Sequence, residues 1–492
     1  MSGGSDIRSR LDAALTAGPV ADVNAALSET EDVWLVGGTI RDILLARELT
    51  DVDLAVGGDV KSVARALHER FRGDIFSLSE RFGTWRISPA AGDWQIDLTA
   101  LRGETIERDL ALRDFTINAM ALPLGATARA AGRRRERALP IDPTGGHGDL
   151  AAKTLRVTGA GVFIDDPLRL LRLARLAVVL GFDLDPETAR LSRAQAGTVT
   201  QAAAERAFAE LRGLVTADDA VGGISLLDEL GLLAALLPEL TDLRGVEQSV
   251  YHHLDAYQHT IEVLERLVEL VADPADVFGD DADELSALLD RPLADEMTSG
   301  QALRFAVLMH DIAKRRTRTV FDDGRVGFPG HDREGARMAR EICRRFNVSD
   351  RFTRFVTTIT AHHLDLGFLV RERPLPPRRV YRYLRGCEPV EVEVGVLSVA
   401  DRLATRGRKS GEAIERHLQL ARELNRAALD WRAGGRPDPL VRGDLLAAEL
   451  GLEHGPRLGE LIDALSEARY AGEIGSASEA IEYARALLES GR

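Results

Sequence analysis

The chain has 492 residues, of which 45% are hydrophobic and 29% are charged, and its formal net charge is −15 at pH 7. This length exceeds a single hydrophobic core and predicts three or four domains, while the acidic balance argues against indiscriminate nucleic-acid binding but leaves room for local basic patches. No apolar run is long enough to span a bilayer, the N-terminus lacks a signal peptide, and the two cysteines stand alone. We therefore expect a cytoplasmic protein that does not bind a membrane, and the sequence implies no protein partner.

The N-terminal part of the chain predicts a small α/β unit. Apolar residues at helical spacing predict helices over 39–47 and 59–71. Residues 125–140 are rich in alanine and arginine and predict a low-order linker. Strands are expected where β-formers alternate with polar residues, at 33–37, 51–56, 74–78, 84–88 and 94–100.

The rest of the chain, from Asp166 onward, predicts an almost entirely helical structure. It is interrupted by an acidic stretch at 273–299, expected to be flexible, and by a turn-rich stretch at 317–330. Basic clusters are either solvated surface or phosphate-binding patches, and they lie at 133–137, 314–318, 371–385 and 402–409.

Two carboxylates stand on one side of a predicted strand. Asp51 and Asp53 are separated by Val52, and alternate residues of a strand point to the same face. Burying both without a partner would cost on the order of several kcal/mol, which a divalent cation would offset. Asp97, in the apolar run WQIDLTA, adds a third carboxylate. The sequence predicts Asp51, Asp53 and Asp97 as the catalytic residues of a two-metal Mg²⁺ site, with Asp51 and Asp53 as metal ligands; the alternative is a surface strand facing water.

A glycine pair precedes these aspartates. Gly37 and Gly38 end the first predicted strand, and Thr39 can cap the helix that follows. Glycines allow a phosphate to approach the backbone closely, and Arg41 on the first helical turn can bind a phosphate with two nitrogens. The order of strand, glycine pair, arginine and DxD therefore predicts a nucleotide triphosphate site.

Five ordered motifs carry a resemblance to a known family. They are GGTIRDILLARELTDVDLAV (37–56), RDFTINAMAL (113–122), IDPTGGHGDLAAKTLR (141–156), DDPLRLLRLARLAVVLGF (165–182) and ERAFAEL (205–211). Together they resemble the class II tRNA nucleotidyltransferases and bacterial poly(A) polymerases of the DNA polymerase beta superfamily. PLVRGDLLAAELGLEHGPRLGELIDAL (439–465) also resembles the RNA-binding tail of some members. In one departure, Leu112 precedes Arg113 where the family often has two arginines.

The resemblance implies an α+β fold, with a small mixed-sheet head like that of DNA polymerase beta followed by helical domains. The expected division is an N-terminal extension (1–24), a nucleotidyltransferase head (25–160), a neck that reads the nucleotide and binds RNA (161–245), an HD metal-dependent phosphohydrolase-like domain (246–410) and a helical RNA-binding tail (411–492).

The resemblance also implies a protein template for nucleotide choice. Asp166 and Arg169 would read the base edge, because a carboxylate accepts from an exocyclic amine and a guanidinium donates to ring atoms. Arg172 and Arg175, three residues apart along the same helix, would lie nearby as nucleotide or phosphate ligands. The alternative is an amphipathic helix whose arginines are solvated. The same resemblance implies that three residues of the second motif belong to the nucleotide site. Arg113 would bind the triphosphate and Asp114 the ribose. Asn118 would tie the motif to the nucleotide loop.

A second constellation resembles the HD phosphohydrolases. It consists of His259, His310-Asp311 and Asp401, with His331 and His362 or His363 where binuclear members place further ligands. Imidazoles with carboxylates suit a transition metal, here Mn²⁺, Ni²⁺, Fe²⁺ or Co²⁺. The alternative is a decayed HD fold that is retained for packing.

The predicted function is a tRNA nucleotidyltransferase that adds CMP and AMP from CTP and ATP to the tRNA 3′ end. Addition of CC only, A only or poly(A) is left open. A different class of function is also possible: an HD phosphohydrolase acting on RNA 2′,3′-cyclic or 2′-phosphate ends, with the head as an RNA-binding module.

Overall fold

A computed structural model describes residues 3–79, 83–130, 139–248, 254–405, 410–434 and 436–490. The chain divides into two compact units. The first comprises residues 1–202 together with 229–232, and the second comprises 203–228 together with 233–492. Among the described residues, no helix combines the length and the apolar composition that crossing a membrane requires.

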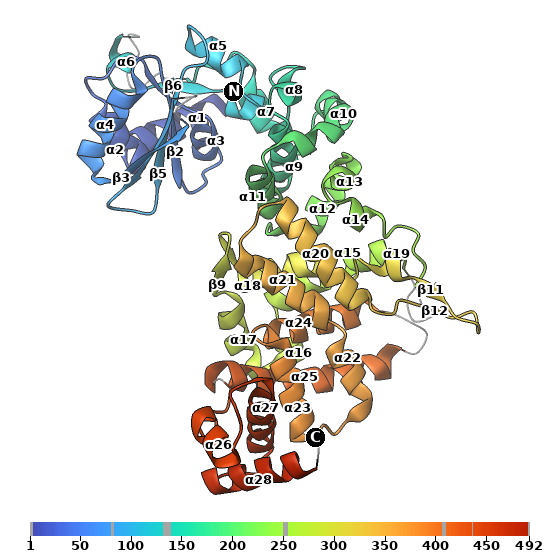
Figure 1. Ribbon diagram of the computed structural model, residues 1–492. Coiled ribbons are helices and arrows are strands. Elements are labelled where there is room, and N and C mark those ends of the chain that lie inside the picture. The colour runs from blue at the N-terminus through green and yellow to red at the C-terminus, as the bar shows by residue number, and fades with distance from the viewer. Residues whose placement is uncertain are drawn as a thin grey trace. The chain divides into compact units, whose positions relative to one another are not determined.

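The first unit is built on a six-stranded mixed sheet with the order β3-β4-β5-β2-β1-β6, shown in blue in Figure 1. β2 and β5 run parallel, and the other neighbouring strands run antiparallel. The strands are β1 (Val33–Val36), β2 (Asp51–Val56), β3 (Gly73–Ser79), β4 (Thr84–Pro89), β5 (Gln95–Ala100) and β6 (Ala121–Pro123). The five strands predicted from the sequence are confirmed, and β6 was not predicted.

The first unit also contains helices, some of which pack on the sheet. The predicted helices at 39–47 and 59–71 are confirmed as α3 and α4, and α4 packs against β3, β4 and β5. The helices of this unit are α1 (Gly3–Thr16), α2 (Pro19–Ala26), α3 (Gly38–Leu44), α4 (Val60–Phe71), α5 (Ile106–Ala111), α6 (Gly125–Ala130), α7 (Gly146–Ala151), α8 (Val162–Asp165), α9 (Leu168–Leu180) and α10 (Pro186–Gln195), with 3₁₀ turns η1 (Thr116–Asn118) and η3 (Ala196–Gln201) and a short parallel pair β7 (Thr154–Leu155) and β8 (Asp183–Leu184).

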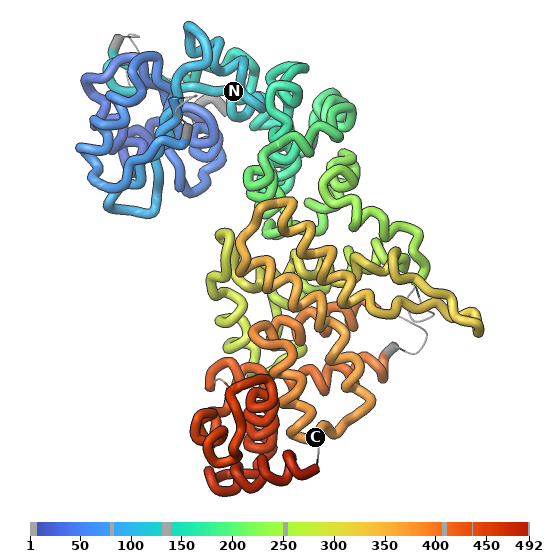
Figure 2. Tube along the Cα trace, viewed as in Figure 1, coloured from blue at the N-terminus to red at the C-terminus, as the bar shows by residue number. Residues whose placement is uncertain are grey.

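The second unit is helical, as predicted. The helices α15, α18, α20, α21 and α24 pack on one another, and Figure 2 traces them in yellow and orange. Its helices are α11 (Ala204–Val215), α12 (Ala220–Glu229), α13 (Leu232–Leu236), α14 (Pro238–Thr241), α15 (Ala256–Ala272), α16 (Ala275–Phe278), α17 (Ala282–Leu289), α18 (Ser299–Met309), α19 (Lys314–Thr317), α20 (His331–Arg345), α21 (Asp350–His362), α22 (Asp365–Leu369), α23 (Pro377–Cys387), α24 (Glu391–Ala404), α25 (Ser410–Gly434), α26 (Gly443–Leu450), α27 (Pro456–Tyr470) and α28 (Ala477–Glu489), with 3₁₀ turns η4 (Gly279–Asp281) and η5 (Val370–Glu372).

The last three helices, drawn in red in Figure 2, share a small hydrophobic core of their own. Leu446 of α26, Ala468 of α27 and Ala480 of α28 are fully buried in it. The tail is therefore a packed element and not a loose extension.

Two expectations about irregular segments were wrong. The acidic stretch 273–299 is ordered as α16, η4, α17 and the hairpin β9 (Pro292–Ala294) and β10 (Met297–Thr298). Its apolar residues recur at helical spacing, so that Val277, Phe278 and Leu285 are buried while the acids face outward. In the predicted linker 125–140, the first six residues form α6; the basic cluster at 133–137 lies outside the described residues. The turn-rich stretch 317–330 contains the hairpin β11 (Thr319–Val320) and β12 (Val326–Gly327).

Candidate functional sites in the head and the HD domain

The three predicted acids lie on two adjacent strands. Asp53 of β2 and Asp97 of β5 are register partners in the parallel pair, and Asp51 lies two residues before Asp53 on the same face. Burial raises the pKa of the Asp53 carboxyl above its ordinary value; Arg113 opposes this, and the charges of Asp97 and Asp51 add to it. The site thus concentrates negative charge that a cation would offset, and its oxygen ligands fit Mg²⁺.

Asp97 has a partner that the sequence did not reveal. Arg86 lies opposite Asp97 in the antiparallel pair of β4 and β5, and its Nε and Nη2 each donate to one carboxylate oxygen at 2.7 Å. This fork occupies both oxygens of Asp97. Metal binding by Asp51 and Asp53 stays a prediction, and the negative charge of Asp97 acts on Asp53 from the neighbouring strand.

The glycine loop is tied to the aspartates by hydrogen bonds. The backbone N–H of Gly38 donates to Asp53 Oδ2 at 3.0 Å. The Thr39 hydroxyl accepts from the Asp53 N–H at 2.7 Å and donates to the Asp51 carbonyl at 3.2 Å. Gly37 has a φ of +69°, and a Cβ there would lie 2.9 Å from Asp53 Oδ2. Glycine is thus required at position 37 for both its backbone angle and its close approach.

Arg41 is partly buried and contacts two other side chains. Its Nε and Nη2 donate to Asp42, and its Nη1 donates to Asn118 Oδ1 at 2.8 Å. Asn118 in turn donates to Asp114 Oδ1 at 3.1 Å. The guanidinium therefore links α3 to η1, and phosphate binding by Arg41 stays a prediction.

The second motif and the predicted reading helix meet at Asp114. Its Oδ2 lies 2.9 Å from Arg172 Nε on α9. Burial opposes ionisation of Asp114, but Arg172, Asn118 and the Phe115 amide outweigh burial, so the pKa of Asp114 lies below its ordinary value. Arg113, four residues after Asp109, is held by that acid at 2.9 Å. The structure thus brings Arg113, Asp114, Asn118 and Arg172 together around the Asp53 edge.

Of the other predicted reading residues, Arg169 lies close enough to this group for the charge of Asp114 to act on it. The helix begins at Leu168, so Asp166 precedes it in extended conformation, and its Oδ1 accepts from the Leu168 N–H at 3.1 Å. Arg169 donates to the carbonyls of Val162 and Leu112, each at 3.3 Å, and burial lowers the pKa of its guanidinium. Arg175 is partly buried two turns further on.

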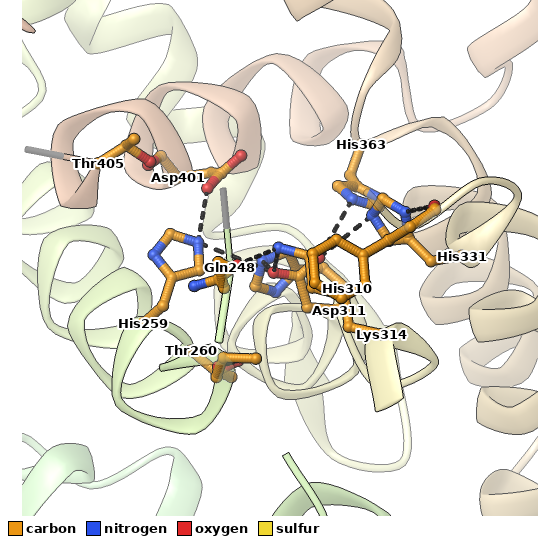
Figure 3. Close-up of polar contacts among 12 residues, drawn as sticks. Gln248, His259, Thr260, His310, Asp311, Lys314, His331, His363, Asp401 and Thr405 are labelled. Carbon is orange, nitrogen blue, oxygen red and sulfur yellow. Dashed lines mark hydrogen bonds and ion pairs between the residues drawn. The ribbon is translucent and has the colours of Figure 1, made fainter. Parts of the chain in front are cut away.

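The HD residues converge in the second unit (Figure 3). His259 Nε2 lies 2.9 Å from Asp401 Oδ1, and donor atoms of His259, His310 and Asp401 all lie within 4.8 Å of one another. Asp311, His331 and His363 form a second group with the same spacing.

Asp311 stands between the two groups. Its Oδ2 lies 3.1 Å from His310 Nε2 and 3.8 Å from His259 Nε2, whereas its Oδ1 lies 3.3 Å from His331 Nε2 and 3.8 Å from His363 Nε2. One carboxylate oxygen faces each group. This is the geometry of a bridging ligand between two metal ions.

The imidazoles are oriented for metal binding. Nδ1 of His310, His331 and His363 each lies 2.7 Å from the backbone carbonyl three residues earlier, and a carbonyl can only accept, so Nδ1 carries the proton. Their buried Nε2 atoms make no hydrogen bond to any described residue. Burial and the charge of His310 lower the pKa of His363 to about 4, which keeps this imidazole neutral. The donor set therefore fits transition-metal ions.

A cation lies beside these ligands. Lys314, one helical turn after Asp311, places its Nζ within ion-pair distance of Asp311 Oδ2 and donates to Gln248. The residue was not singled out in the sequence beyond its basic cluster, although HDIAK places it three residues after Asp311. A cavity of about 600 Å³ opens here, and its lining includes Lys314, Arg371, Arg402 and Arg416. These cations suit an anionic substrate.

Of the two adjacent histidines, the structure places His363 and not His362 in the HD cluster. His362 Nδ1 instead lies 2.8 Å from Asp365 Oδ2. Consecutive helical residues point about 100° apart, so only one of the two can face Asp311. The expectation for His362 as an HD ligand is corrected accordingly.

Comparison with known proteins matches three family models in the order of the domains. They are the Poly A polymerase head domain (residues 33–156), the probable RNA and SrmB- binding site of polymerase A (181–243) and the HD domain (256–406). Proteins with nucleotidyltransferase heads and HD domains use divalent metals, which agrees with the ligand groups described above.

Individual relatives span nearly the whole chain. An A-adding tRNA nucleotidyltransferase of Deinococcus radiodurans is 35% identical over 92% of this chain and 95% of its own, and a CC-adding tRNA nucleotidyltransferase of Thermus thermophilus is 31% identical over 92% of each chain. The fold is shared with a Thermotoga maritima CCA-adding enzyme solved with tRNA (TM-score 0.59, 20% identity, 98% of each chain). The domain order matches these family models, and relatives of 35% and 31% identity span nearly the whole chain. The chain therefore belongs to the tRNA nucleotidyltransferase family.

Proposed function

We propose that the protein transfers CMP, AMP or both from CTP and ATP to the 3′ end of tRNA and releases pyrophosphate. The observation that carries this proposal is the pairing of Asp53 with Asp97 beneath the glycine loop, in a chain whose relatives add C or A to tRNA. Poly(A) addition is the alternative. The cytoplasm stays the predicted location.

In the proposed mechanism, Asp51 and Asp53 would hold Mg²⁺. A divalent ion bound there would supply positive charge for the attacking RNA hydroxyl and for the leaving phosphates. The Gly38 N–H donates to the Asp53 carboxylate, and the Thr39 hydroxyl accepts from the Asp53 backbone N–H, so that the glycine loop is held against β2. Arg113, held by Asp109, faces the same edge and would bind the triphosphate. Asp114 would accept a hydrogen bond from the ribose in place of its present contact with Arg172.

Base choice is proposed to depend on Asp166 and Arg169, with Arg172 and Arg175 as neighbouring ligands. Arg169 donates to two carbonyls at 3.3 Å, which is long for a hydrogen bond, so its donors can turn toward a base edge. Leu168, Leu171 and other apolar residues bury the opposite side of α9 and keep the helix in place.

The test uses tRNA transcripts that lack the final A, the final CA or the whole CCA, each incubated with one labelled nucleoside triphosphate at a time. CCA addition requires incorporation of C into the two shorter substrates and of A into the longest. An A-adding enzyme labels only the transcript that ends in CC. Incorporation of neither nucleotide into any tRNA, with long adenylate tails on other RNAs, would replace the proposal with poly(A) synthesis.

Arg169→Ala is expected to reduce the ratio of kcat/KM for CTP and ATP to kcat/KM for UTP and GTP, because it removes base contacts. Arg41→Ala is expected to lower the rate with all four nucleotides, because it releases η1 from α3. Steady-state kcat/KM for the four triphosphates checks both. If the two variants lose rate equally and discrimination does not change, the protein-template assignment is wrong.

Gly37→Ala is expected to reduce nucleotide addition about a hundredfold, because the new methyl group displaces Asp53 Oδ2. The positive φ also strains alanine by about 1–3 kcal/mol. Gly145→Ala is the matched control, since Gly145 has a φ of +78° but open space around it. Both variants should unfold at lower temperature, and only Gly37→Ala should lose activity. Equal activity in the two would mean that the close approach at Gly37 has no role.

We further propose that the HD domain binds two transition-metal ions (Mn²⁺, Ni²⁺, Fe²⁺ or Co²⁺) and hydrolyses phosphate esters such as RNA 2′,3′-cyclic or 2′-phosphate ends. The bridging position of Asp311 between two ligand groups supports two ions. When bound, these ions would polarise the phosphate and supply a nucleophilic water. Lys314 and the arginines of the cavity would hold the phosphate. A decayed HD fold would not need three imidazoles whose Nε2 atoms face one buried carboxylate.

A further inference from the structure

Three different metal-binding side chains meet at a place that the nucleotidyltransferase and HD sites do not use. His362 is the last residue of α21, Asp365 the first of α22 and Cys387 the last of α23. One donor atom from each lies within 4.8 Å of the other two. Three helix ends thus bring together an imidazole nitrogen, a carboxylate oxygen and a thiol sulfur.

The cluster has a buried side and an open side. Cys387 is fully buried, whereas the side chains of His362 and Asp365 are 30% and 41% exposed. His362 Nδ1 and Asp365 Oδ2 are 2.8 Å apart and already hold each other in place. An ion can therefore reach the thiol from the solvent side, past two ligands that are largely preorganised.

Charge at the cluster favours a cation. Burial raises the pKa of the Cys387 thiol, and the nearby carboxylates of Asp365 and Glu391 raise it further. Without an ion the thiol stays protonated, because a thiolate beside these carboxylates would be unfavourable. A divalent ion would replace that proton, because it neutralises the carboxylate and stabilises the thiolate together.

We propose that His362, Asp365 and Cys387 form a site for one thiophilic divalent transition-metal ion, of which Zn²⁺ is the representative. The thiolate excludes Mg²⁺ and Ca²⁺, which prefer oxygen ligands, and three protein ligands leave a fourth tetrahedral position for water. The site is separate from the HD centre, because His362 points away from the cluster that contains its neighbour His363. An ion here would fix the end of α21, from which His363 also projects.

The competing explanation is simple packing. A buried cysteine behaves as a small hydrophobic residue, and a histidine–aspartate pair near the surface adds little stability. The two explanations differ in whether Cys387 sulfur binds a metal, and this can be measured directly.

The experiment is titration of the full-length, metal-depleted protein with Co²⁺, followed by near-ultraviolet absorption. A thiolate bound to Co²⁺ gives a charge-transfer band, whereas the predicted ligands of the head and the HD centre include no sulfur. We expect one band that saturates at one thiolate-bound ion per chain and disappears when Zn²⁺ is added. Cys387→Ser should abolish it, and Cys343→Ser, which changes the other buried cysteine, should retain it.

Because Cys387 is buried, Cys387→Ser could also disturb the fold. Substitutions of the two partly exposed ligands, His362 and Asp365, test the site without that problem. His362→Ala should weaken Co²⁺ binding at least about tenfold, and the exposed His454→Ala should leave it unchanged. Circular dichroism of each variant checks the fold. The proposal is overturned if the wild-type protein gives no charge-transfer band, or if the band persists with unchanged affinity in His362→Ala and Asp365→Asn.

Discussion

Asp53→Ala is expected to reduce nucleotide addition roughly a thousandfold or more without unfolding the protein. The variant removes a proposed Mg²⁺ ligand, and it also removes the oxygen that accepts from the Gly38 N–H. The metal ion would then be bound more weakly, and the glycine loop would lose a hydrogen bond that holds it in place. The measurement is incorporation of labelled CMP or AMP into tRNA transcripts that lack part of the CCA end.

Stability should move in the opposite direction from activity. Because the pKa of Asp53 is raised in the folded protein, its ionisation destabilises the fold above that pKa, and this cost disappears as the pH falls through the raised pKa toward the ordinary value. Asp53→Asn should therefore unfold at the same or a higher temperature than the wild type at pH 7 in the absence of metal. This gain should vanish in acid.

Asp74→Ala is the matched control, since Asp74 is an exposed acid on β3 of the same sheet. It should add nucleotides at the wild-type rate. Wild-type activity in Asp53→Ala would show that the acidic strand pair is not the catalytic centre, and equal losses in the Asp53 and Asp74 variants would indicate a general defect of the sheet.

Much of the head could be predicted because its signals are local. Alternating apolar residues identify β2 and β5, and two aspartates on one face of a strand are already an anomaly in the sequence. The contact between Arg86 and Asp97 could not be predicted, because it depends on which strands are neighbours and in what register. β6 was missed because three residues carry too little periodicity to stand out.

In the helical region, the types of the ligand residues could be predicted from the sequence, but not the directions of all their side chains. The choice between His362 and His363 depends on where α21 ends and how far the chain has turned, and a shift of one residue rotates a side chain by about 100°. The prediction for the acidic stretch 273–299 was wrong for another reason. Its many charges favoured an exposed, flexible segment, but Leu285 and Leu288 lie between the acids at helical spacing and are buried in α17.

The second large effect is expected from His310→Ala, which should remove transition metal from the HD centre and leave nucleotide addition intact. Asp311 is 2% exposed, and a carboxylate so buried requires compensating positive charge. His310, His259 and Lys314 surround its Oδ2 in the ion-free protein. Loss of the His310 imidazole removes a ligand from one group and weakens the bridge to the other.

Metal content per chain, measured side by side in wild type and His310→Ala, isolates the HD ions, because any other site contributes equally to both proteins. Hydrolysis of 2′,3′-cyclic nucleotides and phosphorylated RNA ends should fall with the metal. Nucleotide addition should persist, because Asp51 and Asp53 lie in the other compact unit. Equal metal content in the two proteins would reduce the HD region to a scaffold. Loss of addition in a variant that still folds would mean that the two sites depend on each other, since His310 belongs to the unit that does not contain Asp51 and Asp53.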